Sequence, residues 1–258
     1  MTPPRGPRAI HRVTACFTPR AQSLVEESGA HMDPRPLVSV VIPVHNGERY
    51  LGDAIESVLG QTYRPIELVI VDDASVDGSA AVCRRFAGIR YIHQPHAGAA
   101  AARNRGVDAA SGTLLSFLDA DDLWVPEKLA RQIAVLDEEP ELDMVLGHVK
   151  QFHSPELDAH AKARIAGDGI VLSGHVGTLL IRRASFFRVG HFTTEWRVGE
   201  FIDWFGRARD VGLTEVTLPD VTLLRRLHTS NMMLRESRST TDYARILKAS
   251  LDRRRMTP

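Results

Sequence analysis

The stretch that decides the fold is Thr113-Leu-Leu-Ser-Phe-Leu-Asp-Ala-Asp-Asp-Leu-Trp124, an apolar strand that runs directly into three carboxylates. These belong to Asp119, Asp121 and Asp122, and open α/β sheets bind their ligands at the carboxyl ends of strands. Like charges this close repel one another unless water or a cation offsets them, and hard oxygen ligands suit Mg²⁺ or Mn²⁺. The alternative is a helix-capping turn, since Pro126 and Glu127 are typical of a first helical turn.

Other apolar runs place this strand in a larger pattern. Short runs rich in valine and isoleucine predict strands over residues 38–43, 66–71, 89–93 and 113–118. Helical patterns separate them. The first buries one face, formed by Leu51, Ala54, Ile55, Val58 and Leu59. The second extends through Val82 and Phe86, with Asp77 expected as its N-cap. Strands that alternate with helices predict right-handed crossovers and a mostly parallel, open α/β sheet flanked by helices.

Four strings in this region resemble family 2 glycosyltransferases of the GT-A fold, in the family's order and spacing. They are Val38-Ser-Val-Val-Ile-Pro-Val-His-Asn46, Glu67-Leu-Val-Ile-Val-Asp-Asp-Ala-Ser-Val-Asp-Gly78, Ala102-Arg-Asn-Arg-Gly106 and Phe117-Leu-Asp-Ala-Asp-Asp122. The resemblance implies a Rossmann-like GT-A sheet. It also implies an inverting enzyme that uses a nucleotide-sugar donor and a divalent cation, Mn²⁺ or Mg²⁺.

The chain begins with an arginine- and proline-rich stretch that has no apolar period, and this stretch and the resemblance together suggest how the chain is organised. A disordered leader is expected over 1–35, and the true start is either Met1 or Met32. A single GT-A domain is expected over 36–235, followed by a helix or tail over 236–258. Within the domain, residues 36–150 form the nucleotide-sugar-binding half, and 151–235 form a less regular acceptor-side half.

Composition narrows the class of protein. A chain of 258 residues, 43% hydrophobic and 25% charged, is typical of a globular protein with a sizeable core. Its formal net charge of zero gives no support to nucleic acid as a partner. Two cysteines, Cys16 and Cys83, are too few for a disulfide framework, which favours a reducing compartment. No apolar run is long enough for a transmembrane helix. We therefore expect a cytoplasmic protein, with peripheral attachment to the inner face of the membrane left open.

In the first half, the expected nucleotide contacts come from strand ends. Pro43 and Val44 offer backbone groups and His45 a ring edge, unless His45 is only a loop histidine. The resemblance gives Asp73 the role of accepting a hydrogen bond from the base, whereas an Asx turn is the structural alternative. Glu48 is a further candidate, or a first-turn helix charge.

Arginine and aspartate side chains are expected around the diphosphate. Arg103 could pair with it bidentately, although a solvated arginine is the alternative. Asp121 would hold the metal directly, and Asp119 would hold the ribose hydroxyl or a metal-bound water. Ala120, between them, belongs to the same contact, and Asp122 is expected to cap the following turn. The metal would supply Lewis-acid stabilisation of the leaving diphosphate.

The second half offers fewer landmarks. Gly177 lies in a small-residue loop, 174–178, that either approaches the donor sugar or simply turns. The family's acceptor base is an acidic residue near here, and we choose Glu200, where the chain enters a helix, with Asp203 as the second choice. His228 resembles the histidine of the family's late Arg-x-His element, which approaches the diphosphate or metal. A capping or surface histidine is the alternative.

The leading hypothesis is therefore transfer of a sugar from a nucleoside-diphosphate sugar to an acceptor hydroxyl. A uridine diphosphate donor is favoured by base rate, and the acceptor could be a glycan, a lipid-linked sugar, a peptide or a small molecule. Two alternatives stay open: a catalytically inactive protein that binds sugar nucleotides or a partner, and a nucleotidyltransferase. The second is disfavoured because no glycine-rich basic loop follows the first strand.

Overall fold

The computed structural model describes residues 35–165, 169–171, 174–231 and 240–256. Residues 1–34 of the expected leader, and the expected boundary at 235–236, lie outside the described residues. The division into leader, domain and tail therefore stays a prediction.

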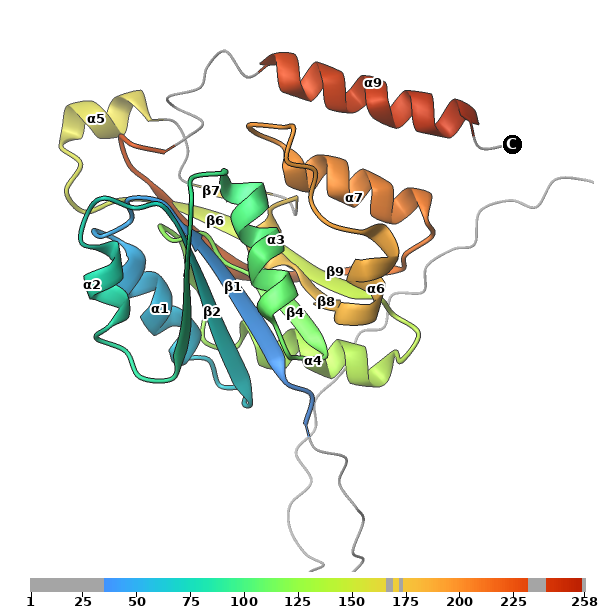
Figure 1. The fold of residues 1–258 in the computed structure, drawn as a ribbon, viewed down its shortest axis with the longest axis horizontal. Helices are drawn as coiled ribbons and strands as arrows, with labels where there is room; N and C mark the ends of the chain where they lie inside the picture. Colours follow the sequence, from blue (N-terminus) through green and yellow to red (C-terminus); the bar gives the residue numbers. More distant parts are fainter. Residues whose placement is uncertain (1–34, 166–168, 172–173, 232–239, 257–258) are drawn as a thin grey trace, which may run out of the picture. The chain divides into compact units, whose positions relative to one another are not determined.

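The first half of the sheet is parallel, in the order β3-β2-β1-β4 (Figure 1). Its strands are β1 (Val38–Val44), β2 (Ile66–Asp73), β3 (Ile89–Gln94) and β4 (Leu114–Phe117). All seven residues of β1 are buried, as expected for a β-branched strand covered on both faces. The four predicted strands are confirmed, each within two residues of its expected ends.

The second half of the sheet is mixed. From β4 the order continues β8-β6-β9-β5, and β7 pairs with β6, which makes nine strands in the described part of the chain. The strands are β5 (Leu123–Trp124), β6 (Met144–His153), β7 (Gly169–Val171), β8 (Leu180–Arg182) and β9 (Glu215–Leu227). Only β6 and β9 are parallel neighbours here. The α/β prediction is confirmed, but "mostly parallel" holds only for the first half, because the strand-helix alternation of the sequence stops there.

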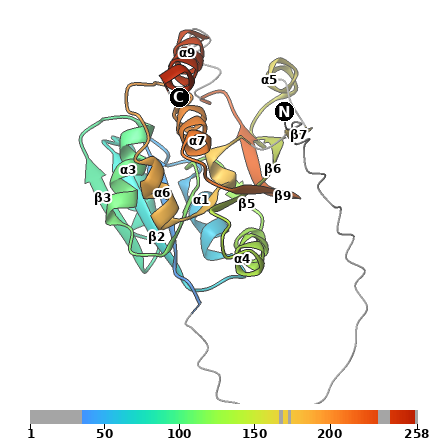
Figure 2. The ribbon, with the colours of Figure 1, turned by 90° about the vertical axis from the view of Figure 1, so that its right-hand side faces the viewer.

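Helices cover both faces of the sheet (Figure 2). One hydrophobic core lies under α1 (Leu51–Leu59) and α4 (Lys128–Glu138). The other lies under α3 (Ala99–Ala109), α6 (Arg183–Val189) and α7 (Glu200–Asp210). The buried face of α1 is as predicted except for Leu59, which is 38% exposed at the last position of the helix.

The remaining helices are short or peripheral: α2 (Ser79–Cys83), α5 (Ala159–Arg164), the 3₁₀ turn η1 (Val176–Thr178) and α9 (Thr240–Met256). Helix α2 ends before Phe86, and Gly78 occupies its N-cap position. Asp77 nevertheless accepts a hydrogen bond from the Ser79 backbone N–H at 3.0 Å, which is the chemistry expected of a cap. Among the described helices, none has the length and apolar character needed to cross a bilayer.

Strand direction gathers the candidate residues at one edge of the sheet. Parallel pairing places the carboxyl ends of β1 and β2 together, with Val44 opposite Asp72. Strand β8 is antiparallel to both β4 and β6, and β9 is parallel to β6, so β9 ends at the same edge as β4. Helix α3 can lie close to β1 because residue 106 is glycine: a Cβ there would be 2.3 Å from Val41 Cγ1.

Candidate active site

Asp73, at the end of β2, has a fully hydrogen-bonded carboxylate. Oδ1 accepts from Gln94 Nε2 at 2.7 Å and from the Ala97 N–H at 2.8 Å, and Oδ2 accepts from the Gly98 N–H at 2.8 Å. Burial alone would raise the pKa of Asp73, but these donors outweigh it and lower the pKa. The carboxylate therefore stays ionised in a buried position and orders the turn that starts α3.

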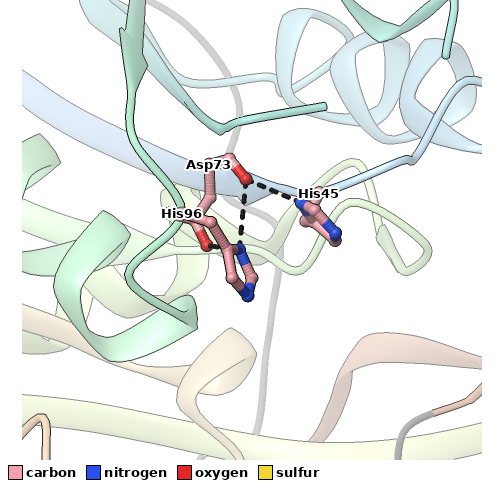
Figure 3. Close-up of side chains that lie close together, drawn as sticks. All are labelled: His45, Asp73 and His96. Atoms are coloured by element: carbon pink, nitrogen blue, oxygen red, sulfur yellow. Dashed lines mark hydrogen bonds and ion pairs between the residues drawn. The ribbon is translucent and has the colours of Figure 1, made fainter. Parts of the chain in front are cut away.

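Two exposed histidines flank Asp73 (Figure 3). His96 Nδ1 lies 2.8 Å from Asp73 Oδ2, and His45 Nδ1 lies 2.6 Å from the Asp73 carbonyl oxygen. The two ring centroids are 4.5 Å apart. Their nitrogens and a carboxylate oxygen lie within 4.8 Å of one another, so the group could also hold a transition metal. His45 and Asp73 were both candidates from the sequence, and they lie together in the structure. No sequence motif indicated His96.

Three further candidates from the first half have structural contacts. Pro43 and Val44 are buried at the end of β1. The Glu48 carboxylate accepts from the Gly78 N–H at 2.9 Å and braces the turn before α2. Their predicted contacts with a nucleotide stay predictions.

Arg103 links the two halves of the site. It is 4% exposed, and its guanidinium lies 2.5 Å from Asp119 Oδ1 through Nη2 and 2.6 Å from Glu200 Oε1 through Nη1. Burial would raise the pKa of Asp119, but the positive charge of Arg103 reverses this effect and lowers it. The Arg103 Nε atom is buried without a hydrogen-bond partner. Arg103 therefore joins a carboxylate after β4 to the first residue of α7.

Asp122, from the same turn, and His175, at the N-cap position of η1, both approach Asp119. Ligand atoms of these three residues lie within 4.8 Å of one another, and His175 Nε2 is 3.7 Å from Asp119 Oδ2. Burial, followed by the charges of Asp121 and Asp119, raises the pKa of Asp122 well above its ordinary value. Burial lowers the pKa of His175, which favours the neutral imidazole that metals bind. The sequence singled out the 174–178 loop but not His175 itself.

Asp121 pairs with the late histidine, His228, whose expected role at the diphosphate or metal stays a prediction. His228 Nε2 lies 2.9 Å from Asp121 Oδ2, and Asn231 Nδ2 lies 3.3 Å from the same oxygen. Ser230 Oγ lies 2.7 Å from His228 Nδ1 and orients the ring. Ala120, half-buried between the two aspartates, packs against the hydrophobic core.

Arg226 holds this aspartate turn in place. Its backbone N–H donates to Asp122 Oδ1 at 2.9 Å, and its Nε donates to the Asp121 carbonyl at 3.1 Å. The prediction that Asp122 caps the following turn is therefore wrong, because its carboxylate reaches across to β9 instead. The Arg226 guanidinium carbon lies over the rings of Tyr50 (4.8 Å) and Phe152 (5.0 Å). Arg226 was missed, although it is the arginine of the Arg-x-His element.

Asp203 makes its contacts outside this group, whereas the Gly177 N–H donates to His175 Nδ1 at 3.1 Å. Asp203 Oδ2 accepts from Thr193 Oγ1 and Arg207 Nε, both at 3.0 Å, and Oδ1 accepts from Arg253 Nη1 at 3.2 Å. The Gly177 carbonyl accepts from Trp124 Nε1 at 2.8 Å. In the structure, both residues brace neighbouring elements.

Similarity to known proteins identifies the family. The sequence model described as glycosyl transferase family 2 matches residues 39–199, from β1 to the start of α7. The chain belongs to glycosyl transferase family 2.

Two relatives each match just under half of the chain. Glycosyltransferase GlyA of Streptococcus pneumoniae is 36% identical over 123 residues, which are 46% of this chain and 18% of that protein. The uncharacterized glycosyltransferase EpsJ of Bacillus subtilis is 36% identical over 136 residues, which are 48% of this chain and 39% of that protein. The matched region is thus less than half of either relative.

Solved structures share the family's fold over more of the chain. S. aureus TarS 1-349 in complex with UDP-GlcNAc covers 84% of this chain and 66% of its own, with a TM-score of 0.69 and 19% identity. The mannosyltransferase PcManGT from Pyrobaculum calidifontis, in complex with GDP-Man and Mn²⁺, covers 84% of this chain and 65% of its own, with a TM-score of 0.64 and 21% identity. At these identities the likeness supports the fold, which agrees with the predicted GT-A class.

The side chains present fit the divalent cation that the resemblance implies. Asp119, Asp122 and His175 offer two carboxylates and an imidazole within 4.8 Å. The Asp121 carboxylate is not one of these three and pairs with His228. A cation would also relieve the repulsion that raises the pKa of Asp122. Carboxylates with one imidazole form a donor set that suits a divalent cation.

Proposed function

We propose that this chain is a metal-dependent, inverting glycosyltransferase that moves a sugar from a nucleoside-diphosphate sugar to an acceptor hydroxyl. The observation that carries the proposal is the Asp119–Arg103–Glu200 chain of ion pairs, at 2.5 and 2.6 Å. These ion pairs fix Asp119, one of the three clustered aspartates, at a defined position relative to Glu200 on the expected acceptor side. Positioning of this kind supplies a large share of catalysis in transfer reactions.

The donor would lie along the edge of the sheet. Asp73 and the backbone of Pro43 and Val44 would meet the base, and Asp119 would meet the ribose or a metal-bound water. Asp121, with Asp119, Asp122, His175 and His228 as the available partners, would hold the cation. The cation supplies Lewis-acid stabilisation of the leaving diphosphate. TarS and PcManGT were solved with UDP-GlcNAc and GDP-Man, so a nucleotide sugar is the natural donor class, with UDP favoured by base rate.

Glu200 would act as the base. Its carboxylate side chain is 16% exposed at the start of α7, and Arg103 holds it in one orientation. It would accept the acceptor hydroxyl's proton as that oxygen attacks the anomeric carbon from the side opposite the leaving diphosphate. One such displacement inverts the anomeric configuration.

The decisive experiment measures nucleotide release from a panel of nucleotide sugars with Mn²⁺. Chelation should abolish release, and added Mn²⁺ should restore it. Glu200→Gln should lower the rate by roughly 10²–10⁴-fold and leave donor affinity unchanged. Glu195→Gln, an exposed glutamate just before α7, is the matched control and should keep the wild-type rate.

A second candidate is an inactive sugar-nucleotide-binding protein, because a buried arginine already occupies the Glu200 carboxylate. Donor binding by the wild-type chain without turnover of any donor would favour this reading. Turnover that is indifferent to both glutamate changes would instead remove Glu200 from the mechanism.

A further inference from the structure

Helix α9 has an exposed apolar stripe beside its buried side. Tyr243, Leu247 and Leu251 are 38%, 62% and 46% exposed, and their spacing of four residues places them on one line along the helix. The buried side is carried by Ile246, which is 4% exposed. Figures 1 and 2 both show α9 on the outer side of α7, farthest from the sheet. Tyr243 also packs near the start of α7, since a Cβ at Gly199 would lie 3.2 Å from its Cε1. Leu247 and Leu251 are the more exposed part of the stripe.

Positive charge lies along one side of this stripe. Residues 240–256 contain five lysines or arginines and two aspartates, a net charge of +3. Lys248 is exposed, and the Arg255 side chain is 80% exposed. Both lie about a quarter-turn from the stripe. Of the two aspartates, Asp242 is turned inward, since it is 14% exposed and accepts from the Arg197 N–H at 3.1 Å. Asp252 is 52% exposed and lies 4.0 Å from Arg255.

We propose that α9 binds an anionic membrane surface, with Tyr243, Leu247 and Leu251 inserted among the head groups. Lys248 and Arg255 would then lie level with the lipid phosphates. A helix with an apolar line beside cationic side chains binds in this way, through burial of the apolar line and attraction to acidic lipids. The stripe is only three residues long, so charge carries a comparable share of the binding. A second copy of the chain fits less well, because two cationic helices would repel.

The helix is tied to the loop that carries the proposed base. A Cβ at Gly199 would lie 2.8 Å from Ile246 Cδ1, and Arg253 Nη1 lies 3.2 Å from Asp203 Oδ1 on α7. Membrane binding by α9 would thus bring the Glu200 end of α7 towards the bilayer. Resting on the proposed function, this geometry points to an acceptor that is carried by a lipid.

The test is co-sedimentation of the full chain with vesicles. We expect binding to phosphatidylcholine mixed with phosphatidylglycerol, little binding to phosphatidylcholine alone, and weaker binding at high salt. Leu247→Asp combined with Leu251→Asp should lower the partition coefficient at least about tenfold, since two leucine insertions are lost. Lys248→Glu combined with Arg255→Glu should have a similar effect. Leu59→Asp, which changes a 38% exposed leucine at the end of α1, is the matched control and should bind like wild type.

Three outcomes would overturn the proposal. They are no binding to the acidic vesicles, binding that both double variants retain, and a stable dimer in sedimentation analysis that the leucine double variant abolishes. Nucleotide release without vesicles should be the same for wild type and variants, which shows that the variants fold. If wild type binds vesicles but releases no nucleotide from any donor, the proposed function fails while the membrane surface stands.

Discussion

Two acidic centres at the same edge of the sheet are held in different ways. Asp73 after β2 is surrounded mainly by neutral donors, among them the backbone N–H groups of Ala97 and Gly98. Its pKa is lowered. The β4 cluster, defined as Asp119, Asp121 and Asp122, crowds three carboxylates, and within it the pKa of Asp122 is raised. The Asp73 carboxylate receives its hydrogen bonds from the chain itself. The three carboxylates of the β4 cluster repel one another unless positive charge lies beside them.

The residues that contact the two centres also differ in how far away they lie along the chain. Asp73 is served by residues about twenty positions away, in β3 and at the start of α3. The β4 cluster is served by Arg103 of α3, His175 before η1, and Arg226 and His228 at the end of β9. A cation would add to the same set. The contacts of Asp73 thus come from a short stretch of chain, whereas the β4 cluster depends on long-range contacts.

The largest effect is expected when one charge is removed from the β4 cluster. Asp121→Asn should lower donor turnover by about 10³-fold or more, since the cation that stabilises the leaving diphosphate loses a ligand charge. Thermal unfolding should occur within a few degrees of wild type, because Asp121 is at the open edge of the sheet. Asp220→Asn, which changes an exposed aspartate of β9, is the control. Wild-type turnover with unchanged metal dependence in Asp121→Asn would remove Asp121 from the metal site.

The second test weakens the cluster's support without touching its carboxylates. Arg226→Met keeps much of the side chain's length but removes the Nε donor to the Asp121 carbonyl. Because residues behind the ligands tune metal sites, Mn²⁺ affinity should fall by about 10–100-fold. Isothermal titration with Mn²⁺ measures this, and Arg131→Met, at an exposed ion pair, serves as the control. Unchanged affinity would mean that the aspartate turn holds its shape without Arg226.

How much the sequence could predict follows the same division. The four parallel strands were predictable because each is a short apolar run that ends in a turn signal. The β4 aspartates and Asp73 were predictable because they follow such runs directly. His96, His175 and Arg226 were missed or undervalued because long-range topology brings them in, and neither spacing nor periodicity records it. The mixed second half of the sheet was missed for the same reason, since β8 and β7 are three residues long and carry almost no pattern.

A third test measures how much Asp73 contributes to the stability of the protein. Asp73→Asn should lower the free energy of unfolding by about 1–3 kcal/mol at pH 7, since buried N–H donors lose a charged acceptor. The folded pKa of Asp73 is lowered, so its stabilisation is full above the unfolded pKa of about 3.9. It disappears as the pH falls through the lower folded value. Urea unfolding of both proteins from pH 7 downward should show the gap narrowing at acidic pH. A gap that does not change with pH would mean that the charge of Asp73 contributes nothing.

The smallest effect on turnover is expected at Asp203, three residues from the proposed base. Its carboxylate binds Thr193, Arg207 and Arg253. Asp203→Asn therefore removes a charge that holds elements of the protein together, and we expect it to disturb no contact with the substrate. Turnover per folded molecule should stay within about threefold of wild type, because no transition-state interaction is lost. Stability should fall by about 1–3 kcal/mol as charge-assisted hydrogen bonds weaken. Steady-state kinetics of Asp203→Asn and Glu200→Gln, measured side by side, test which of the two acids is the base. Of the two, only Glu200 is joined through Arg103 to the β4 cluster. A loss in Asp203→Asn as large as that in Glu200→Gln would transfer the base to Asp203, and the Arg103 bridge would then be only a support.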